Sequence, residues 1–217
     1  VALVDSAAAR FGRVTALVNA AATTERGSII VTSPEDFDRH IAVNTRGPFF
    51  ALQRFAQLAV AGGYPASAVN ILSMVVHCGQ SFLAPYSASK AALANVTKNA
   101  AQALRGNRIR VNAINCGWMD TPGEDETQRK YHGATDGWLA AAEAAQPMGM
   151  LVKPVHVARL ASYMLSPASG VMTGAVVSGE GFGLGASLKP RPSNWSRRVV
   201  LMRLNNAVGA ARWPRRR

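Results

Sequence analysis

Three side chains suited to proton transfer stand close together in the sequence. Tyr86 and Lys90 are four residues apart, and Ser73 lies thirteen positions before the tyrosine. Residues four apart on a helix project from nearly the same face, so we expect the ammonium beside the phenol. A free phenol has a pKa of about 10, and a nearby cation favours its ionised form. The spacing therefore predicts that Lys90 lowers the pKa of Tyr86 and makes it a general acid or base.

Ser73 ends an apolar run typical of a buried strand, so its hydroxyl is expected to reach the same place. It would hold the oxygen whose proton the tyrosine gives or takes, which suits the interconversion of alcohols and ketones. A tyrosine and a lysine at helical spacing more often only pack on a surface. Their occurrence with Ser73, after a buried strand and at the start of a helix, favours catalysis.

The motifs around these residues resemble the short-chain dehydrogenases/reductases, which are nicotinamide-dependent enzymes with a Rossmann-like fold. The resemblance covers residues 1–174. It rests on segments in the family's order, at residues 17–22, 43–44, 69–73, 86–90, 109–114 and 116–121. Three positions depart from the family pattern, since Ala20 and Ala22 stand in place of an asparagine and a glycine, and Cys116 stands in place of a proline.

The resemblance implies an α/β fold, a Rossmann-like parallel sheet with flanking helices, that lacks the first three strands. The missing part would carry the glycine-rich turn that holds the cofactor pyrophosphate and the residue that selects NAD or NADP. The residue patterns predict helices at 1–11, 33–62, 86–106 and 154–166, and strands at 14–21, 68–73, 108–114 and 172–177. Residues 122–147 form a long connection that is a candidate lid.

The resemblance also implies roles for individual residues. The catalytic residues would be Asn44, Ser73, Tyr86 and Lys90, with Asn44 positioning a water for proton relay. The cofactor would be NAD or NADP. It would contact Asn19, Ala20, Ala21, Tyr86, Lys90, Gly117, Met119 and Thr121. A homo-oligomer formed through the two long helices is expected on the same ground.

The substrate is less clear from the sequence, although His77, Gln80 and Trp118 are candidate contacts. A sugar or polyol is the first hypothesis, because polar residues such as Asp120 lie in the loops, and a 3-oxoacyl or steroid-like ketone is the second. A catalytic triad at His77 is disfavoured, because no acid is placed to orient it. Two cysteines give neither a disulfide framework nor a zinc spacing, and no metal site is predicted.

Composition limits the class of protein. At 217 residues and 48% hydrophobic content, the chain can bury one sizeable core. It contains no apolar run of about 18 residues and no signal-peptide pattern at its start, so we expect a cytoplasmic protein without a membrane span.

The net charge of +12 is concentrated near the end of the chain. Residues 1–182 hold 15 Lys/Arg and 12 Asp/Glu, whereas residues 183–217 hold nine Lys/Arg and no acid. We therefore predict that residues 1–182 are part of a Rossmann-like domain and that 183–217 are a basic, disordered tail. Nucleic-acid binding is expected only as non-specific contacts of this tail. An alternative function remains, in which an inactive fragment associates through its helices or binds polyanions through the tail.

Overall fold

A computed structural model describes residues 1–179 of the chain, so the predicted tail at 183–217 lies outside the described residues. The secondary structure is mostly helices and strands in alternation. Its main elements are α1 (Ala2–Phe11), β1 (Ala16–Asn19), α2 (Pro34–Ile41), α3 (Gly47–Ala61), β2 (Ala66–Ser73), α4 (Ala84–Leu104), β3 (Ile109–Cys116), α5 (Pro122–His132), α6 (Trp138–Ala144), α7 (Pro154–Leu165) and β4 (Val176–Gly179).

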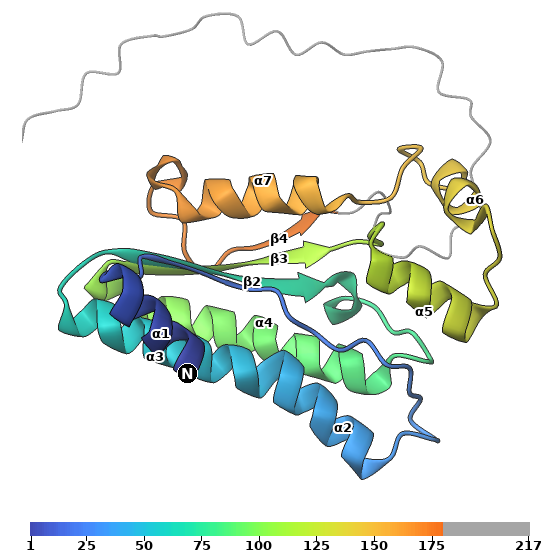
Figure 1. The fold of residues 1–217 in the computed structure, drawn as a ribbon, viewed down its shortest axis with the longest axis horizontal. Coiled ribbons are helices and arrows are strands. Elements are labelled where there is room, and N and C mark those ends of the chain that lie inside the picture. Colours follow the sequence, from blue (N-terminus) through green and yellow to red (C-terminus); the bar gives the residue numbers. More distant parts are fainter. Residues whose placement is uncertain (180–217) are drawn as a thin grey trace, which may run out of the picture. The chain divides into compact units, whose positions relative to one another are not determined.

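The four strands form one parallel sheet in the order β1-β2-β3-β4. Helices α3 and α4 lie on one face and α7 lies on the other, while α5 and α6 lie beyond the carboxyl end of β3 (Figure 1). Parallel strands connected by helices must bury both faces of the sheet, which explains their apolar sequences. The predicted Rossmann-like α/β fold is confirmed.

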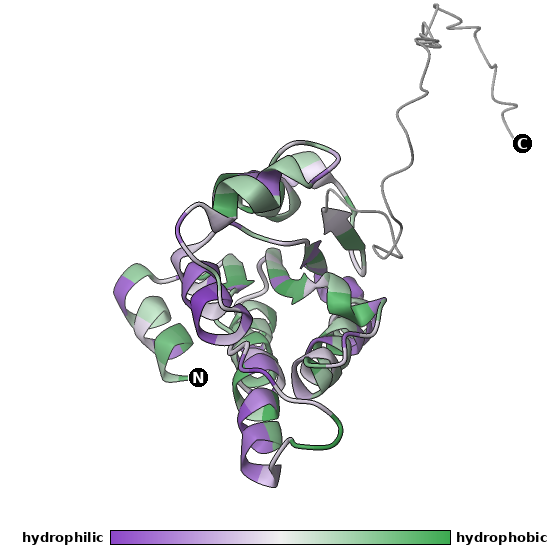
Figure 2. Ribbon diagram, turned by 90° about the vertical axis from the view of Figure 1, so that its right-hand side faces the viewer, coloured by the Kyte–Doolittle hydropathy of each residue, from purple (hydrophilic) through white to green (hydrophobic). Residues whose placement is uncertain are grey.

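Alternating side chains of the central strands fill two cores. Val69 and Ile114 pack with Met164 of α7, whereas Leu72 packs with Leu93 of α4 on the opposite face. The apolar sides of the helices face these cores. Figure 2 shows the hydrophilic α2 and, beside it, the hydrophobic loop that leads into this helix. No helix within residues 1–179 is long and apolar enough to cross a membrane.

The long helix predicted for residues 33–62 is interrupted in the structure. The Ser33 side chain accepts a hydrogen bond from the Asp36 amide and caps α2, as a serine before proline favours. Between α2 and α3, Ala42–Arg46 forms a turn of π-helix, which the apolar pattern did not predict. Such turns carry one extra residue and occur often at functional sites. This turn contains Asn44.

The two outer strands differ from their predicted bounds. Strand β1 begins at Ala16 rather than residue 14, because its register with β2 starts at the Ala16–Ser67 pair. Strand β4 begins at Val176 rather than residue 172. Side chains as well as backbone bonds to β3 hold the segment before β4: the Thr173 hydroxyl accepts from the Val111 amide, and the Asn112 amide contacts the backbone of Met172 and Ala175.

Candidate active site

Strand β2 and helix α4 bring Ser73, Tyr86 and Lys90 to the carboxyl edge of the sheet. Ser73 is the last residue of β2 and stands in register with Cys116 at the end of β3. Tyr86 lies in the first turn of α4, and Lys90 follows one turn later. The Lys90 ammonium lies 5.7 Å from the centre of the Tyr86 ring, as the helical spacing predicted.

The ammonium of Lys90 is fixed by the end of the neighbouring strand. Its Nζ donates to the Ile71 carbonyl oxygen at 2.8 Å, and only 3% of the residue is exposed. Burial lowers the pKa of Lys90 to about 8. The nearby Cys116 thiol is also buried, which raises its pKa to about 11 although Lys90 acts against this shift. Both groups are therefore held in a site with little water.

The pKa of Tyr86 departs from the sequence prediction. Burial raises the pKa of this phenol to about 12, although a hydrogen bond with Ser73 acts to lower it. The expectation that Lys90 lowers this pKa below its usual value is therefore wrong. The physical reason is that the phenolate would lose water, while the ammonium is directed to the Ile71 carbonyl.

Asn44 ties the π turn to the catalytic helix and to the loop after β1. Its amide donates to the Thr23 carbonyl oxygen at 2.9 Å and to the Ser89 hydroxyl at 3.0 Å, and its oxygen accepts from the Thr23 amide at 2.9 Å. Ser89 in turn donates to the Tyr86 carbonyl oxygen at 2.7 Å. The side chain of Asn44 thus fixes the helical turn between Tyr86 and Lys90.

The residues predicted to contact a cofactor lie along the same edge of the sheet, but they differ in how exposed they are and in which hydrogen-bonding groups remain free. The Asn19 side chain is partly exposed, and its amide nitrogen donates to Asn70 at 2.8 Å. Ala20 and Ala21, after β1, are exposed. Thr121 caps α5 by accepting from the Glu124 amide at 3.1 Å, which leaves the hydroxyl proton of Thr121 to donate elsewhere.

Gly117 and Met119 belong to the loop between β3 and α5. The Gly117 amide donates to the Gly179 carbonyl oxygen at 3.0 Å, and Met119 forms an isolated bridge with Val152. Next to them, Asp120 pairs with Lys153 at 2.7 Å. The loop is therefore fixed from both sides.

The predicted substrate contacts are brought to this edge from two loops. His77 and Gln80 are exposed in the connection from β2 to α4. Trp118 follows β3, where its ring stacks on Trp138 at 6.2 Å and its indole donates to Glu124 at 2.7 Å. The structure thus places an aromatic residue of α6 against the cofactor loop.

Asn115 is a residue that the sequence reasoning missed. It is fully buried at the end of β3, and its amide nitrogen lies 2.8 Å from Nε2 of His77. Its amide oxygen has no partner among the described residues. The sequence did contain a signal for this role, namely the two asparagines Asn112 and Asn115 in an apolar strand. A polar residue in a buried strand is unusual unless it forms a hydrogen bond with another group.

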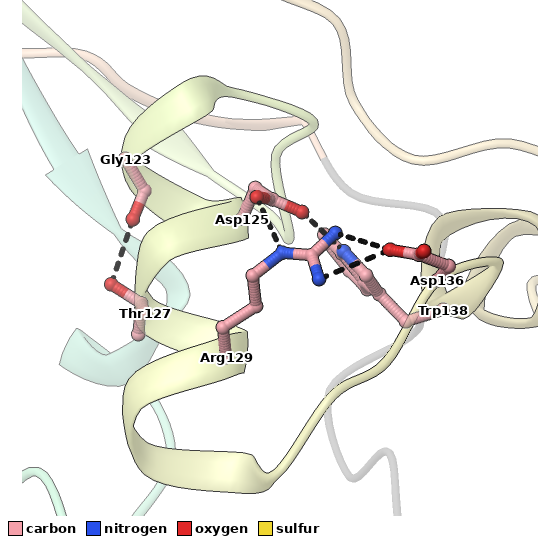
Figure 3. A network of polar contacts seen from close by, with 6 residues as sticks. All are labelled: Gly123, Asp125, Thr127, Arg129, Asp136 and Trp138. Atoms are coloured by element: carbon pink, nitrogen blue, oxygen red, sulfur yellow. Dashed lines mark hydrogen bonds and ion pairs between the residues drawn. The ribbon is translucent and has the colours of Figure 1, made fainter.

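The candidate lid, residues 122–147, forms helices α5 and α6 joined by a polar network (Figure 3). Arg129 pairs with Asp125 at 2.9 Å and with Asp136 at 3.2 Å, and the Trp138 indole donates to Asp125 at 2.6 Å. These charged side chains are well exposed. The two helices are thus held to each other by surface contacts.

Comparison with known proteins decides the family. A family model described as enoyl-(acyl carrier protein) reductase matches residues 1–181, and a solved structure described as a short chain dehydrogenase/reductase family protein superposes with a TM-score of 0.70 at 28% identity, covering 82% of this chain and 70% of that one. The chain belongs to the short-chain dehydrogenase/reductase family.

Two further relatives of this short-chain dehydrogenase/reductase are informative. The (3R)-3-hydroxyacyl-CoA dehydrogenase of Canis lupus familiaris is 34% identical over 161 residues, which are 74% of this chain and 60% of the relative. A gluconate 5-dehydrogenase from Burkholderia cenocepacia, solved in complex with NADP and tartrate, superposes with a TM-score of 0.74 at 25% identity, covering 86% of this chain and 71% of that one.

The chain thus spans about 60% of the length of the first of these relatives. A third relative is the 3-oxoacyl-(acyl-carrier-protein) reductase of Thermotoga maritima. It is 31% identical over 179 residues, which are 82% of this chain and 70% of the relative.

Proposed function

We propose that this short-chain dehydrogenase/reductase transfers a hydride between NAD or NADP and an alcohol or ketone. The observation that carries the proposal is the assembly of Tyr86, Lys90 and Ser73 at one strand edge, with Lys90 buried and its ammonium bound to the Ile71 carbonyl. A phenol, an ammonium and a hydroxyl in one partly desolvated place match the needs of proton transfer to a carbonyl oxygen.

Each side chain has a distinct task in this proposal. Ser73 holds the substrate oxygen by a hydrogen bond, and Tyr86 gives that oxygen a proton in reduction or removes it in oxidation. In oxidation the phenolate must form, which burial opposes by raising the pKa of Tyr86 to about 12. A positive charge close to the phenol is therefore required at the moment of transfer, and the Lys90 ammonium lies 5.7 Å from the centre of its ring. Asn44 supports the relay by fixing this turn of α4.

The donors at this edge fit the nicotinamide half of the cofactor. An ammonium has three protons, and Lys90 uses one on the Ile71 carbonyl, which leaves two for ribose hydroxyls. Thr121 retains its hydroxyl proton for an amide oxygen, and Ala20 and Ala21 permit close approach to β1. A bound nicotinamide accepts or supplies the hydride. The chain's own residues orient the substrate beside it and move the proton.

For the substrate, we favour a 3-hydroxyacyl or 3-oxoacyl compound over a sugar or polyol. Two relatives above 30% identity are named for acyl substrates, whereas the sugar-acid enzyme is 25% identical. The polar residues that suggested a sugar are also occupied. Asp120 pairs with Lys153, and His77 contacts Asn115. The loop therefore offers fewer free polar groups than its sequence indicated.

We further propose that a second copy of the chain covers the paired helices α3 and α4. A groove of about 930 Å³ runs between them, and its lining includes Phe49, Val60, Val96 and Leu104 but no charged residue. Phe49 and Val60 are 42% and 45% exposed. An uncharged apolar groove between long helices favours association. Light scattering of the chain and of an Ala100→Glu variant tests this, since only the variant should be monomeric.

The proposed reaction is tested by cofactor binding and turnover. Calorimetry with NAD, NADH, NADP and NADPH should give binding of at least one pair to the wild type and to a Tyr86→Phe variant. Oxidation of 3-hydroxyacyl thioesters and of polyols should then occur with the wild type only. A folded chain that binds no cofactor would overturn the proposal and leave the alternative of a non-catalytic, associating protein. The cytoplasmic location stays a prediction.

A further inference from the structure

Arg26 lies at the meeting point of three segments around the candidate active site. The backbone next to it is fixed, because the Gly27 amide donates to the Phe82 carbonyl oxygen at 3.0 Å and the Ala84 amide donates to Gly27 at 2.9 Å. A side chain at position 27 would meet Thr32 at 2.5 Å and Pro85 at 3.2 Å, so glycine permits this approach. The loop after β1 is thereby held against the start of α4.

The guanidinium of Arg26 extends from this bridge to the last turn of α5. It lies 5.4 Å from the centre of the Phe82 ring and 5.8 Å from that of Tyr131. Its Nε and Nη2 are 3.3 and 3.1 Å from Nε2 of His132, and its Nη1 donates to the Thr24 carbonyl oxygen at 3.1 Å. We call Glu25, Arg26, Phe82, Tyr131 and His132 the clasp.

The residue beside Arg26 strengthens the same contact. The Glu25 carboxylate accepts from the Tyr131 hydroxyl and pairs with Lys130 at 3.4 Å. Arg26 has no carboxylate partner within residues 1–179, so its charge is met by two aromatic faces and an imidazole. A guanidinium can only donate hydrogen bonds, so the group that Arg26 faces here must offer an acceptor.

We propose that Arg26 is a positioning residue that closes α5 over the active site, and that it does so only while His132 is neutral. Both nitrogens of Arg26 are donors, so Nε2 of His132 must be the acceptor and its proton must lie on Nδ1. This inference rests on the proposed function for its effect on turnover. The clasp itself is a property of the fold.

Protonation of His132 removes the acceptor and places a cation about 3.1 Å from the guanidinium. The clasp's contribution to closure is therefore lost when the imidazole is protonated. The other charged groups here are Glu25 across the contact, Lys130 on the same helix and Arg39 of α2, which also acts on Glu25. A second imidazole, His40 of α2, lies 3.1 Å from the Glu25 carbonyl oxygen behind the clasp. Because a variant at position 132 leaves His40 unchanged, it distinguishes a pH effect of His132 from one of His40.

Hydrogen exchange of α5 tests the clasp without any turnover. The wild type should protect residues 122–132 at a pH of about 8, and Arg26→Met should raise their exchange rate about tenfold. His132→Gln keeps an acceptor but cannot be protonated. At a pH of about 5 the wild type should therefore exchange about tenfold faster than His132→Gln measured in the same buffer.

Arg13→Met is the matched control, since Arg13 also lies over a ring, that of Tyr64 at 5.6 Å, but precedes β1. It should leave α5 unchanged. Equal exchange of wild type and His132→Gln at low pH, or no change in Arg26→Met at high pH, would overturn the proposal.

The kinetic consequence is a rise in KM rather than a loss of kcat. Arg26→Met should raise KM about tenfold at all pH values. The KM of the wild type should show this rise only at acid pH. The KM of His132→Gln should not rise at acid pH. Arg26→Lys should restore less than half of the effect, because an ammonium lacks the two-pronged geometry. If the chain shows no turnover but the exchange results hold, the proposed function fails and the clasp stands. Turnover with a KM that no variant alters overturns the clasp's positioning role.

Discussion

Helix α4 and the pair α5–α6 contribute to the same site but are held in different ways. Around α4, Asn44 and Ser89 are fully buried and Lys90 is 3% exposed, and their partners are backbone carbonyls and hydroxyls. Around α5, the side chains of Arg129 and Asp136 are 46% and 100% exposed. Buried neutral hydrogen bonds resist salt, whereas exposed ion pairs are screened. We call the buried contacts of Asn44, Ser89 and Lys90 the rigid wall, and we call helices α5 and α6 with their exposed ion pairs the cover. The comparison indicates that the rigid wall keeps its geometry while the cover can adjust.

The largest expected effect is on the rigid wall. Ser73→Ala should lower kcat by about 10²–10⁴-fold, because it removes the hydroxyl that holds the substrate oxygen. Its stability should change little, because this half-buried hydroxyl makes a long contact of 3.4 Å with the Val75 amide and one hydrogen bond with Tyr86. Kinetics and urea unfolding of the variant check both points, and Ser73→Thr should recover part of the rate. Full activity in Ser73→Ala would remove the hydroxyl from the mechanism.

The second effect concerns the pH dependence of stability. Burial lowers the pKa of Lys90 to about 8, whereas an unfolded lysine titrates near 10.4. Between these values the unfolded chain binds the extra proton, so the free energy of unfolding contributed by Lys90 rises with pH, by about 2–3 kcal/mol. Below pH 8 the cost of the buried charge is present in full.

Urea unfolding of the wild type and of Lys90→Met from pH 7 to 10 measures this contribution. The difference between them should shift in favour of the wild type as pH rises. Tyr86 and Cys116 have raised pKa values of about 12 and about 11, so they lower stability at alkaline pH in both proteins. A difference independent of pH would mean that Lys90 keeps an ordinary pKa.

A third, similar effect is expected at the π turn. Asn44→Ala should lower the free energy of unfolding by about 2 kcal/mol, because it removes a fully buried amide side chain and leaves the half-buried amide and carbonyl of Thr23 without that partner. Asn107→Ala changes an exposed asparagine and serves as the control. Equal stability of the two variants would contradict the assignment of Asn44 to the rigid wall.

The smallest effect should come from the cover. Arg129→Met removes the pairs with Asp125 and Asp136 (Figure 3), and it should leave global unfolding unchanged while residues 133–138 exchange faster. In about 1 M salt the wild type should behave like the variant, because the pairs are then screened. A cooperative loss of stability in Arg129→Met would show that α5 and α6 belong to the rigid part.

Sequence reasoning predicted what depends on local patterns. The apolar runs identified the strands, and Ser33 before Pro34 marked the start of α2. The placement of Tyr86 beside Lys90 followed from helical geometry. The raised pKa of Tyr86 could not be predicted from helical geometry, because the burial of this side chain depends on how the loops cover the site.

The contacts that the sequence did not predict join residues far apart in the chain. Asn115 and His77 are separated by 38 positions, and Arg26 and His132 by 106. No periodicity connects such residues, since their approach depends on how the strand ends meet. The π turn was missed for another reason, because one extra residue hardly alters an apolar pattern that already continues through both helices.

The π turn at Ala42–Arg46 also gives the chain an unusual response to a deletion. Removing one residue from an α-helix rotates one half against the other by about 100°. Here the same deletion would return the turn to regular α-helix, because the π turn already holds one extra residue. Helices α2 and α3 would therefore keep nearly the same angular phase, and His40 would stay near the Glu25 carbonyl. The turn thus lets the chain lose one residue without rotating the helix that supports the clasp against the helix that packs on the sheet.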